Sequence, residues 1–360
     1  MKKILFAAHD PGGMNVLAPV IDFFATQEEY EVLLVLLGPA RGKHRIPAGR
    51  ARLLDIPSAP LPEFPNEQGV DQNDVARLLQ AHAPDCIFTA TSYNSTLEKH
   101  LIALGRQLRI PTAAILDFWG NYRLRFTAGH DTHFPDIIFV ADQKMATGLQ
   151  QEGVDVDIVL CGNPHLSRLA ATHVRPSAAP NPTKKTFRFF SENIAHYFPD
   201  KPLNEFVIVA HILRFLEQAT IEATFIIRPH PMESPAPWQA FINKQKPANA
   251  IDLCLDTLDF NALLSQPFTA IGLTSMALIE TAVRGIPTFS YQIAVPDDGY
   301  LFLPYEEYGI IRLRDEKDLE MLLATDNIFA RKLADKKRDE PLKVIRQHIT
   351  NLLAAPKRTY

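Results

Sequence analysis

The sequence predicts an α/β protein made of two doubly wound domains, each a parallel sheet covered by helices on both faces. Buried strand-like runs alternate with amphipathic helical segments along most of the chain, and this rhythm favours parallel sheets. At 360 residues the chain is also long for a single hydrophobic core. The stretch 172–186 is polar, rich in proline and without periodicity, which is typical of a linker. We therefore expect one domain over residues 1–171 and a second over residues 186–335.

The composition is that of a globular protein, with 46% hydrophobic and 22% charged residues. A net charge of −4 argues against a broad nucleic-acid surface. The apolar run at the N-terminus is cut by His9 and Asp10, which makes it too short for a signal peptide, and we expect a cytoplasmic protein. The cysteines Cys86, Cys161 and Cys254 lie in or beside apolar runs, so we expect reduced core thiols.

In the first domain, polar residues follow three predicted strands. Strands are expected over 3–8, 32–37, 86–90, 111–116, 137–140 and 158–161, and helices over 14–26, 73–82, from 97 to about 109 and up to Gly153. His9 and Asp10 follow the first strand, Thr91 and Ser92 a later one, and Asp117 the next. Ligands collect beyond the carboxyl ends of such strands. We predict that these residues share one edge of the sheet.

Two further segments of the first domain leave alternatives open. Gly12 and Gly13 form a glycine turn after the first strand, but the third glycine of a dinucleotide-binding fingerprint is missing. The stretch 38–50 is rich in arginine and lysine, and we predict a loop. It is either a solvated loop or a contact for a phosphorylated acceptor or an anionic membrane surface.

In the second domain, strands are expected over 187–190, 223–227, 250–255, 268–273, 288–291 and 310–313. Helices are expected over 203–218, around 238–244 and through 263–264, and two more between 316 and 353. The first of these strands ends at Ser191, and the second ends at Arg228-Pro229-His230, a cation and an imidazole suited to a diphosphate.

The segment 268–291 is predicted to be a strand, a turn at Thr274 and Ser275, a helix that ends at Arg284, and a second strand. Either turn residue can cap the helix, and unpaired N–H groups at a helix N-terminus suit a phosphate. Glu280 lies five residues beyond Ser275, roughly 7 to 8 Å along the helix axis, so it could reach a ribose. The alternative is a solvent-facing glutamate.

This segment, including the Gly285-Ile286-Pro287 that follows its helix, resembles the nucleotide-sugar site of GT-B fold glycosyltransferases and UDP-N-acetylglucosamine 2-epimerases. The resemblance implies two Rossmann-like domains facing across a cleft, with residues 336–360 forming a helix that packs back on the first domain. It implies that Thr274 and Ser275 meet the phosphates and Glu280 the ribose. The His-Pro pair at His230 resembles that of bacterial sialyltransferases and CDP-glycerol or capsule transferases. The chain departs from the superfamily after Gly162-Asn163-Pro164, where relatives often carry an aspartate.

Asp10, His9 and Asp117 are the candidate catalytic bases, because a transfer to a hydroxyl needs a carboxylate or imidazole beside it. For Asp10 the alternative is a turn-forming aspartate. The acceptor-side candidates are two aromatic residues able to stack on a sugar, with core packing as their alternative, and two cations: Trp119, Tyr122, Arg123 and Arg125. Asp155 and Asp157 have a metal-binding spacing but precede a strand, so we expect no metal site.

The first hypothesis for function is a metal-independent glycosyltransferase. It would use a nucleotide-sugar of UDP or CMP type, with no other cofactor, and a glycan or lipid-linked acceptor. The nucleotide-sugar would be held by the residues named above: Ser191, Arg228, His230, Thr274, Ser275, Glu280, Gly12 and Gly13. The alternatives are a UDP-sugar 2-epimerase or hydrolase, and a non-catalytic partner subunit that binds a nucleotide or glycan. A homo-oligomer and a peripheral membrane contact stay open.

Overall fold

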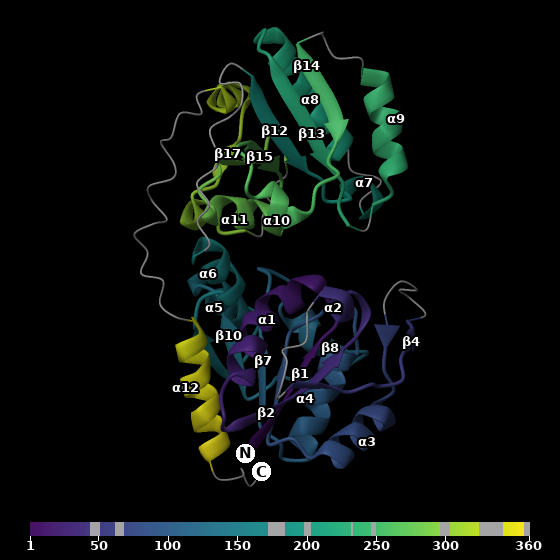
Figure 1. Ribbon diagram of the computed structural model, residues 1–360, viewed down its shortest axis with the longest axis vertical. Coiled ribbons are helices and arrows are strands. Elements are labelled where there is room, and N and C mark those ends of the chain that lie inside the picture. The colour runs from purple at the N-terminus through teal and green to yellow at the C-terminus, as the bar shows by residue number, and fades with distance from the viewer. Residues whose placement is uncertain are drawn as a thin grey trace. The chain divides into compact units, whose positions relative to one another are not determined.

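The computed structural model describes residues 1–43, 51–61, 68–171, 184–197, 203–231, 233–245, 250–295, 303–323 and 341–355. The chain divides into two compact units, Met1–Arg168 with Arg338–Tyr360, and Leu169–Lys337. Each unit is an α/β domain around its own parallel sheet (Figure 1). The prediction of two Rossmann-like domains is confirmed. Most of the predicted linker 172–186, most of the basic stretch 38–50 and the end of the second predicted domain fall outside the described residues. The last two residues of the predicted linker belong to the first strand of the second domain.

The first domain is built on a seven-stranded sheet in the order β11-β10-β7-β6-β1-β2-β3. All its neighbouring strands run parallel. The strands are β1 (Lys2–Ala8), β2 (Tyr30–Leu36), β3 (Ala51–Leu53), β6 (Cys86–Thr89), β7 (Thr112–Ile115), β10 (Ile137–Val140) and β11 (Asp157–Leu160). The chain runs outward in opposite directions from β1 and β6, so the carboxyl ends of these two strands form a topological switch point.

Helices cover both faces of this sheet. The helices are α1 (Pro11–Ala25), α2 (Gly38–Lys43), α3 (Gln72–His82), α4 (Leu97–Gln107), α5 (Gln143–Gln151), α6 (Pro164–Ala171) and α12 (Pro341–Ala354). One face packs Ile4 and Phe6 of β1 against α1 and α12, whose Ile345 and Ile349 are fully buried. The other face packs Leu5 and Ala7 against α3 and α4. Alternate residues of one strand thus reach two separate cores.

Short elements complete the first domain. They are the pairs β4 (Ala59–Pro60) with β5 (Gln68–Gly69) and β8 (Thr127–Ala128) with β9 (Asp131–Thr132), and the 3₁₀ helix η1 (Arg123–Phe126).

The second domain has a six-stranded parallel sheet in the order β14-β13-β12-β15-β16-β17. Its strands are β12 (Lys185–Phe190), β13 (Ala223–Arg228), β14 (Ile251–Leu255), β15 (Thr269–Gly272), β16 (Thr288–Tyr291) and β17 (Ile311–Leu313). Its switch point lies between β12 and β15. Its helices are α7 (Ile194–Tyr197), α8 (Glu205–Gln218), α9 (Pro235–Gln245), α10 (Phe260–Leu263), α11 (Met276–Val283), η2 (Glu306–Tyr308) and η3 (Glu316–Leu322).

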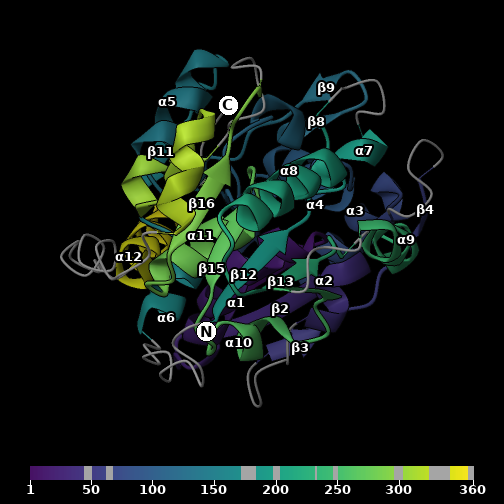
Figure 2. The same ribbon diagram turned by 90° about the horizontal axis from the view of Figure 1, so that it is seen from above.

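The core on one face of this sheet is rich in aromatic side chains. The α8 helix lies across β12 and β13, as Figure 2 shows, and buries Ile208 and Ile212 against Phe187 and Phe225. Trp238 of α9 is fully buried in the same core.

The two helices expected between 316 and 353 are present, the first as the 3₁₀ helix η3 and the second as α12. Some other local predictions were wrong. Residues 38–43 form helix α2 where a loop was predicted. Cys86 and Cys161 are buried as expected, but Cys254 is exposed because it lies on β14, an edge strand. In the described residues, no helix is long and apolar enough to cross a membrane.

Candidate functional site

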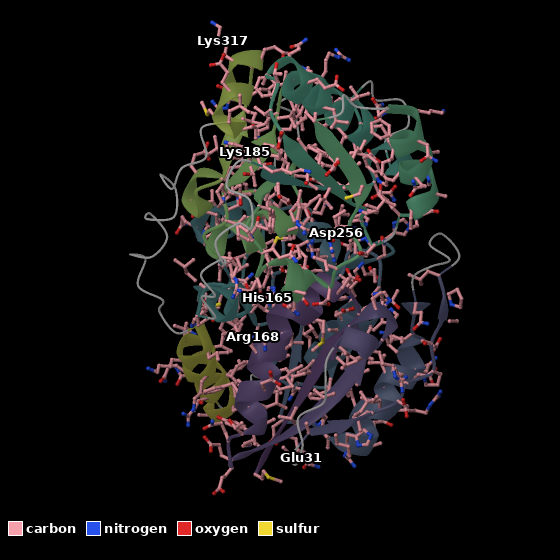
Figure 3. All side chains as sticks on the ribbon, turned by 45° about the horizontal axis from the view of Figure 1, so that its top comes forward. Glu31, His165, Arg168, Lys185, Asp256 and Lys317 are labelled. Atoms are coloured by element: carbon pink, nitrogen blue, oxygen red, sulfur yellow. The ribbon has the colours of Figure 1, made fainter. Side chains whose placement is uncertain are left out.

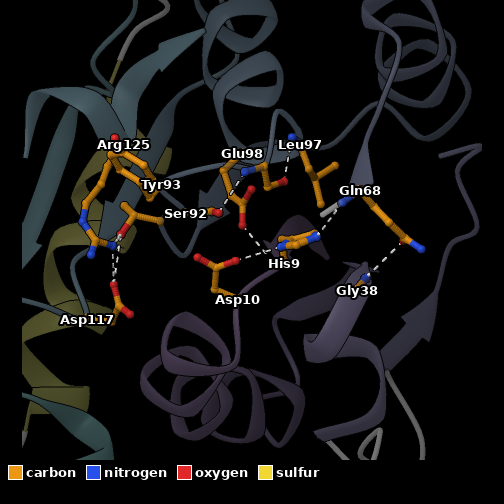
Figure 4. Close-up of polar contacts among 12 residues, drawn as sticks. His9, Asp10, Gly38, Gln68, Ser92, Tyr93, Leu97, Glu98, Asp117 and Arg125 are labelled. Carbon is orange, nitrogen blue, oxygen red and sulfur yellow. Dashed lines mark hydrogen bonds and ion pairs between the residues drawn. The ribbon is translucent and has the colours of Figure 1, made fainter. Parts of the chain in front are cut away.

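The carboxyl edge of the first sheet gathers polar residues from several elements at the switch point. His9 and Asp10 follow β1, Thr91 and Ser92 follow β6 by two and three residues, and Asp117 follows β7. Figure 4 shows Asp10, Glu98 and Asp117 reaching this edge from three different segments. The structure thus brings the three predicted catalytic residues to one region, as their places at strand ends imply.

His9 is fully buried, and its hydrogen bonds fix its tautomer. The backbone N–H of Gln68 donates to Nε2 at 3.2 Å, so Nε2 carries a lone pair. The imidazole is therefore neutral, and its Nδ1–H donates to Asp10 Oδ1 at 2.8 Å. A side chain on Gly38 would bring a Cβ within 2.6 Å of Nε2, so a glycine is needed there. His9 holds and orients Asp10 and has no free nitrogen to act as a base.

Asp10 stands at the N-cap position of α1, yet its side chain caps no backbone N–H of that helix. Pro11 follows at the first helical position, where a missing N–H costs nothing. The Asp10 carboxylate points to His9 instead, and 28% of the side chain is exposed. The Asp10 carboxylate therefore contacts His9 and solvent and not the helix that it begins.

Asp117 is held by a buried ion pair. Arg125 Nη1 donates to Asp117 Oδ1 at 2.7 Å and to Thr91 Oγ1 at 3.1 Å. Burial raises the pKa of Asp117, the Asp10 charge raises it further, and Arg125 opposes both. A side chain on Gly12 would place a Cβ 2.5 Å from Asp117 Oδ2, so this glycine lets the helix approach the carboxylate.

Glu98 is a member of this site that the sequence analysis missed. It lies in the first turn of α4 with 1% exposure, and its Oε1 accepts the backbone N–H of His9 at 2.8 Å. Burial raises its pKa, and the Asp10 charge adds to the shift. A glutamate one residue into a helix that follows a polar strand end was the available signal.

The predicted acceptor-side aromatics lie in the core. Trp119 is 1% exposed and its Nε1 donates to Asp142 Oδ2 at 2.7 Å, and Tyr122 is also buried. Their burial favours the packing alternative. Arg125 is committed to Asp117, whereas Arg123 is exposed, with its guanidinium over the Phe134 ring.

In the second domain, the turn predicted to bind phosphate already holds a carboxylate. Ser275 caps α11 by accepting the N–H of Ala277, as predicted. However, Glu192 Oε1 accepts three backbone N–H groups, from Leu273 at 2.8 Å, Thr274 at 2.7 Å and Ser275 at 2.9 Å. These N–H groups precede the first helical residue, Met276, and they are already paired because β12 ends directly beside β15 and places Glu192 at the turn. Phosphate binding at the helix N-terminus stays a prediction.

Burial raises the pKa of Glu192 to about 7, and the three N–H bonds oppose that shift. Glu192 could have been found from sequence, because it follows a strand end as His9 and Asp10 do.

Glu280 is 8% exposed, so the solvent-facing alternative was wrong. It lies on α11, where all residues from 278 to 283 are buried. The ribose contact stays a prediction.

The His-Pro segment is tied together by Glu233. Glu233 accepts the backbone N–H of His230 and, at 2.9 Å, the hydroxyl of Ser191. Burial lowers the pKa of His230, which favours the neutral imidazole at neutral pH. Ser191 and His230 are therefore brought together at the ends of β12 and β13.

Arg228 is engaged within the domain. It donates to Asp256 Oδ2 at 3.3 Å and to the carbonyl of Leu258 at 2.9 Å. Asp256, labelled in Figure 3, also pairs with the buried Arg188 at 2.7 Å. A phosphate contact from Arg228 would have to share the cation with Asp256.

Gly13 packs its backbone against Ala90 and Thr91, since a Cβ there would lie 2.8 Å from the Ala90 Cβ. Among the described side chains, no group of three or more histidines, cysteines or carboxylates has a geometry suited to a metal ion.

Comparison with known proteins rests on the fold. No family model and no curated protein matches the sequence. The Staphylococcus aureus MnaA complex with UDP has a TM-score of 0.66 at 13% identity, over 100% of both chains. The Neisseria meningitidis UDP-GlcNAc 2-epimerase bound to UDP-GlcNAc has a TM-score of 0.65 at 14% identity, over 98% of this chain and 99% of that one. Anabaena HepE with UDP and glucose has a TM-score of 0.59 at 14% identity, over 99% and 100%. The chain thus has the two-domain fold of these UDP-binding proteins.

Proposed function

We propose that this protein is an enzyme that acts on a UDP-sugar by acid–base chemistry, of the 2-epimerase or hydrolase type. The observation that carries the proposal is the meeting of Asp10, Glu98 and Asp117 at one switch point, where burial raises the pKa of two of these carboxyls. Perturbed carboxyls grouped at a ligand-binding edge are typical of active sites. The UDP-GlcNAc 2-epimerases among the proteins of similar fold support the same choice.

The chemistry suits such a group. Inverting a ring carbon requires one residue to remove a proton and another to return a proton to the opposite face. Hydrolysis requires a group that activates water and a stabilised leaving nucleotide. Two neighbouring carboxyl groups in different environments can have different pKa values, so that one acts as the acid and the other as the base. We assign Asp10 and Asp117 to these roles, with His9 as a positioning residue.

The nucleotide is proposed to bind the second domain. Ser191, His230, Thr274, Ser275 and Glu280 come from three segments that follow β12, β13 and β15. Because Glu192 holds three N–H groups of the turn, the phosphates would meet the hydroxyls of Thr274 and Ser275 or would displace Glu192. The Arg228 contact, the Gly12–Gly13 contact and the Glu280–ribose contact belong to the same proposal.

A glycosyltransferase is the second candidate. The observation that favours it is the HepE structure of similar fold, which holds UDP together with glucose. This candidate needs an acceptor, a glycan or lipid-linked sugar, whereas an epimerase or hydrolase needs none. Exposed Arg123 is the acceptor-side residue that fits it best.

The test is to incubate the protein with UDP-GlcNAc and related UDP-sugars and to follow the sugar protons by NMR. A 2-epimer or a free sugar formed without acceptor supports the proposal. Turnover that starts only when an oligosaccharide acceptor is added favours the transferase. The Asp10→Asn variant should lose turnover, and Asp55→Asn, which alters a carboxylate that is 79% exposed in the same domain, should keep it.

Binding is tested separately by calorimetry with UDP, GDP, CDP, CMP and dTDP. We expect micromolar binding of UDP. Glu280→Ala should abolish this binding, and Glu307→Ala, at an exposed position of the same domain, should not. If none of the nucleotides binds and no UDP-sugar is converted, the proposed function is wrong, and a partner subunit is the better description.

A further inference from the structure

The Glu98 carboxyl has two oxygens in different situations. Oε1 accepts the backbone N–H of His9 at 2.8 Å. Oε2 is buried and has no hydrogen-bond partner among the described residues. An ionised carboxylate is an acceptor on both oxygens, and leaving one of them buried without a donor is unfavourable. Protonation lowers this cost, because a neutral buried carboxyl is less unfavourable than a buried charge.

The groups around Glu98 offset a negative charge only in part. A hydrogen bond with the Ser95 side chain lowers the pKa of Glu98, but burial is the larger effect and raises it. From the loop after β1, Asp10 contributes a carboxylate and His9 a neutral ring, since the hydrogen bond from Gln68 occupies Nε2. On α4 itself, Lys99 is the next residue, but its Nζ donates to the carbonyl of Tyr93 at 2.8 Å. Side chains at successive helix positions do not face each other. Burial lowers the pKa of Lys99, which further weakens it as a counter-ion.

We propose that Glu98 is held as a neutral carboxylic acid at neutral pH and that it acts as a positioning residue for Asp10. Glu98 fixes the His9 backbone, His9 Nδ1–H fixes Asp10, and Asp10 is the carboxylate that carries the charge on this side of the site (Figure 4). Burial and the Asp10 charge raise the pKa of Glu98, in agreement with this geometry. The protonation state concerns the structure alone, and the role toward Asp10 rests on the proposed function.

The arrangement has a consequence for pH. When Glu98 ionises at alkaline pH, a second negative charge appears beside Asp10 and loosens the His9–Asp10 contact. Glutamine cannot ionise, and it has nearly the same shape as the neutral acid. Glu98→Gln should therefore preserve the site and remove its sensitivity to alkaline pH.

The first experiment is infrared difference spectroscopy of the wild type and Glu98→Gln at neutral pH. We expect the wild type minus Glu98→Gln difference spectrum to contain the carbonyl-stretch band of a protonated carboxylic acid, shifted in heavy water. Carboxyls common to both proteins cancel in this difference, including Glu192, whose pKa is about 7. Glu307→Gln, at an exposed carboxyl, should leave the band unchanged. If the difference spectrum lacks this band, Glu98 is not protonated in the wild type. Nitrogen NMR of His9 should show protonated Nδ1 and unprotonated Nε2 in both proteins.

The second experiment measures the pH profile of UDP-sugar turnover. In Glu98→Gln the alkaline limb of the profile, expressed relative to the variant's own maximum, should extend to higher pH than in the wild type. An alkaline limb at the wild-type pH, with an unchanged His9 tautomer, would overturn the positioning role. The infrared and NMR results stand whether or not the protein converts a UDP-sugar, so the failure of the proposed function is distinguishable from the failure of this inference.

Discussion

At the switch point of each domain, a glutamate accepts backbone N–H groups from a neighbouring segment, but the number of these groups differs. In the first domain, Glu98 reaches from the helix after β6 to the backbone that follows β1, and accepts one N–H group. In the second domain, Glu192 follows the central strand β12 and reaches to the turn after β15, where it accepts three. The second carboxyl is held by the backbone, whereas the first has one oxygen without a hydrogen-bond partner among the described residues and lies near Asp10. Each switch point therefore holds a buried or half-buried carboxyl, and only in the second domain does that carboxyl hold a turn through several N–H groups.

The helices that begin at the two switch points also differ in how they are capped. The Ser275 hydroxyl accepts an N–H group of α11, whereas the Asp10 carboxylate, at the N-cap of α1, accepts a hydrogen bond from His9 instead. A residue that gives up a capping bond forgoes roughly 1 kcal/mol of stability. That loss is typical of residues kept for function.

The largest expected effect is on catalysis in the first domain. Asp10→Asn should lower UDP-sugar turnover by about 10²- to 10⁴-fold, because asparagine still accepts the His9 hydrogen bond but cannot take a proton. Steady-state kinetics measures the loss, with Asp55→Asn as control. If Asp10→Asn turns over UDP-sugar as fast as the wild type, Asp10 is not a catalytic residue, and the first switch point does not differ from the second in this way.

The next effect is on stability in the second domain. Glu192→Ala should cost about 3 kcal/mol, because three backbone N–H groups lose a shared acceptor. The chain has two tryptophans, so a Trp119→Phe background leaves Trp238 to report urea unfolding of the second domain alone. Glu192→Gln in the same background should cost less, since an amide oxygen remains. If the alanine variant is as stable as its background, the three hydrogen bonds do not hold the turn.

Stability of the second domain should also depend on pH through Glu192. Its folded pKa, about 7, lies above the ordinary value of 4.5. The folded state therefore binds the proton more tightly, and this contribution is complete below about pH 4.5 and is lost as the pH rises through about 7. Glu192 is only half-buried, so we expect a loss of about 1 to 2 kcal/mol between about pH 5 and pH 8, relative to Glu192→Gln. Parallel pH curves for the two proteins would contradict this.

The smallest expected effect is a difference in unfolding free energy between variants of the two N-cap residues, Ser275 and Asp10. Ser275→Ala should cost about 1 kcal/mol of unfolding free energy through the lost cap of α11. Asp10→Ala should not show a capping loss, since its side chain caps no N–H of α1. Chemical denaturation of both variants measures the difference. A larger stability loss for Asp10→Ala than for Ser275→Ala would show that Asp10 contributes mainly to the fold.

Much of the fold could be predicted because hydrophobic pattern and strand ends are local signals. The strand Ile137–Val140 and the strand Thr288–Tyr291 were predicted to the residue. Local signals also placed Asp10 and Asp117 at one sheet edge. They could not reveal that Glu192 fills the turn at Thr274, because that contact joins residues 82 positions apart. Nor could they show that Trp119 is buried on Asp142, since an aromatic in a polar loop looks the same whether packed or exposed.

The return of the chain to its first domain has a consequence for folding. Ile345 and Ile349 of α12 are fully buried in the core that β1 and α1 begin, and Tyr30 hydrogen-bonds Thr350 at 3.2 Å across 320 residues. Contacts this distant in sequence form late and slow the folding of the unit that needs them. During synthesis the second domain is complete before α12 leaves the ribosome. The domain that is made first is therefore the one that finishes folding last.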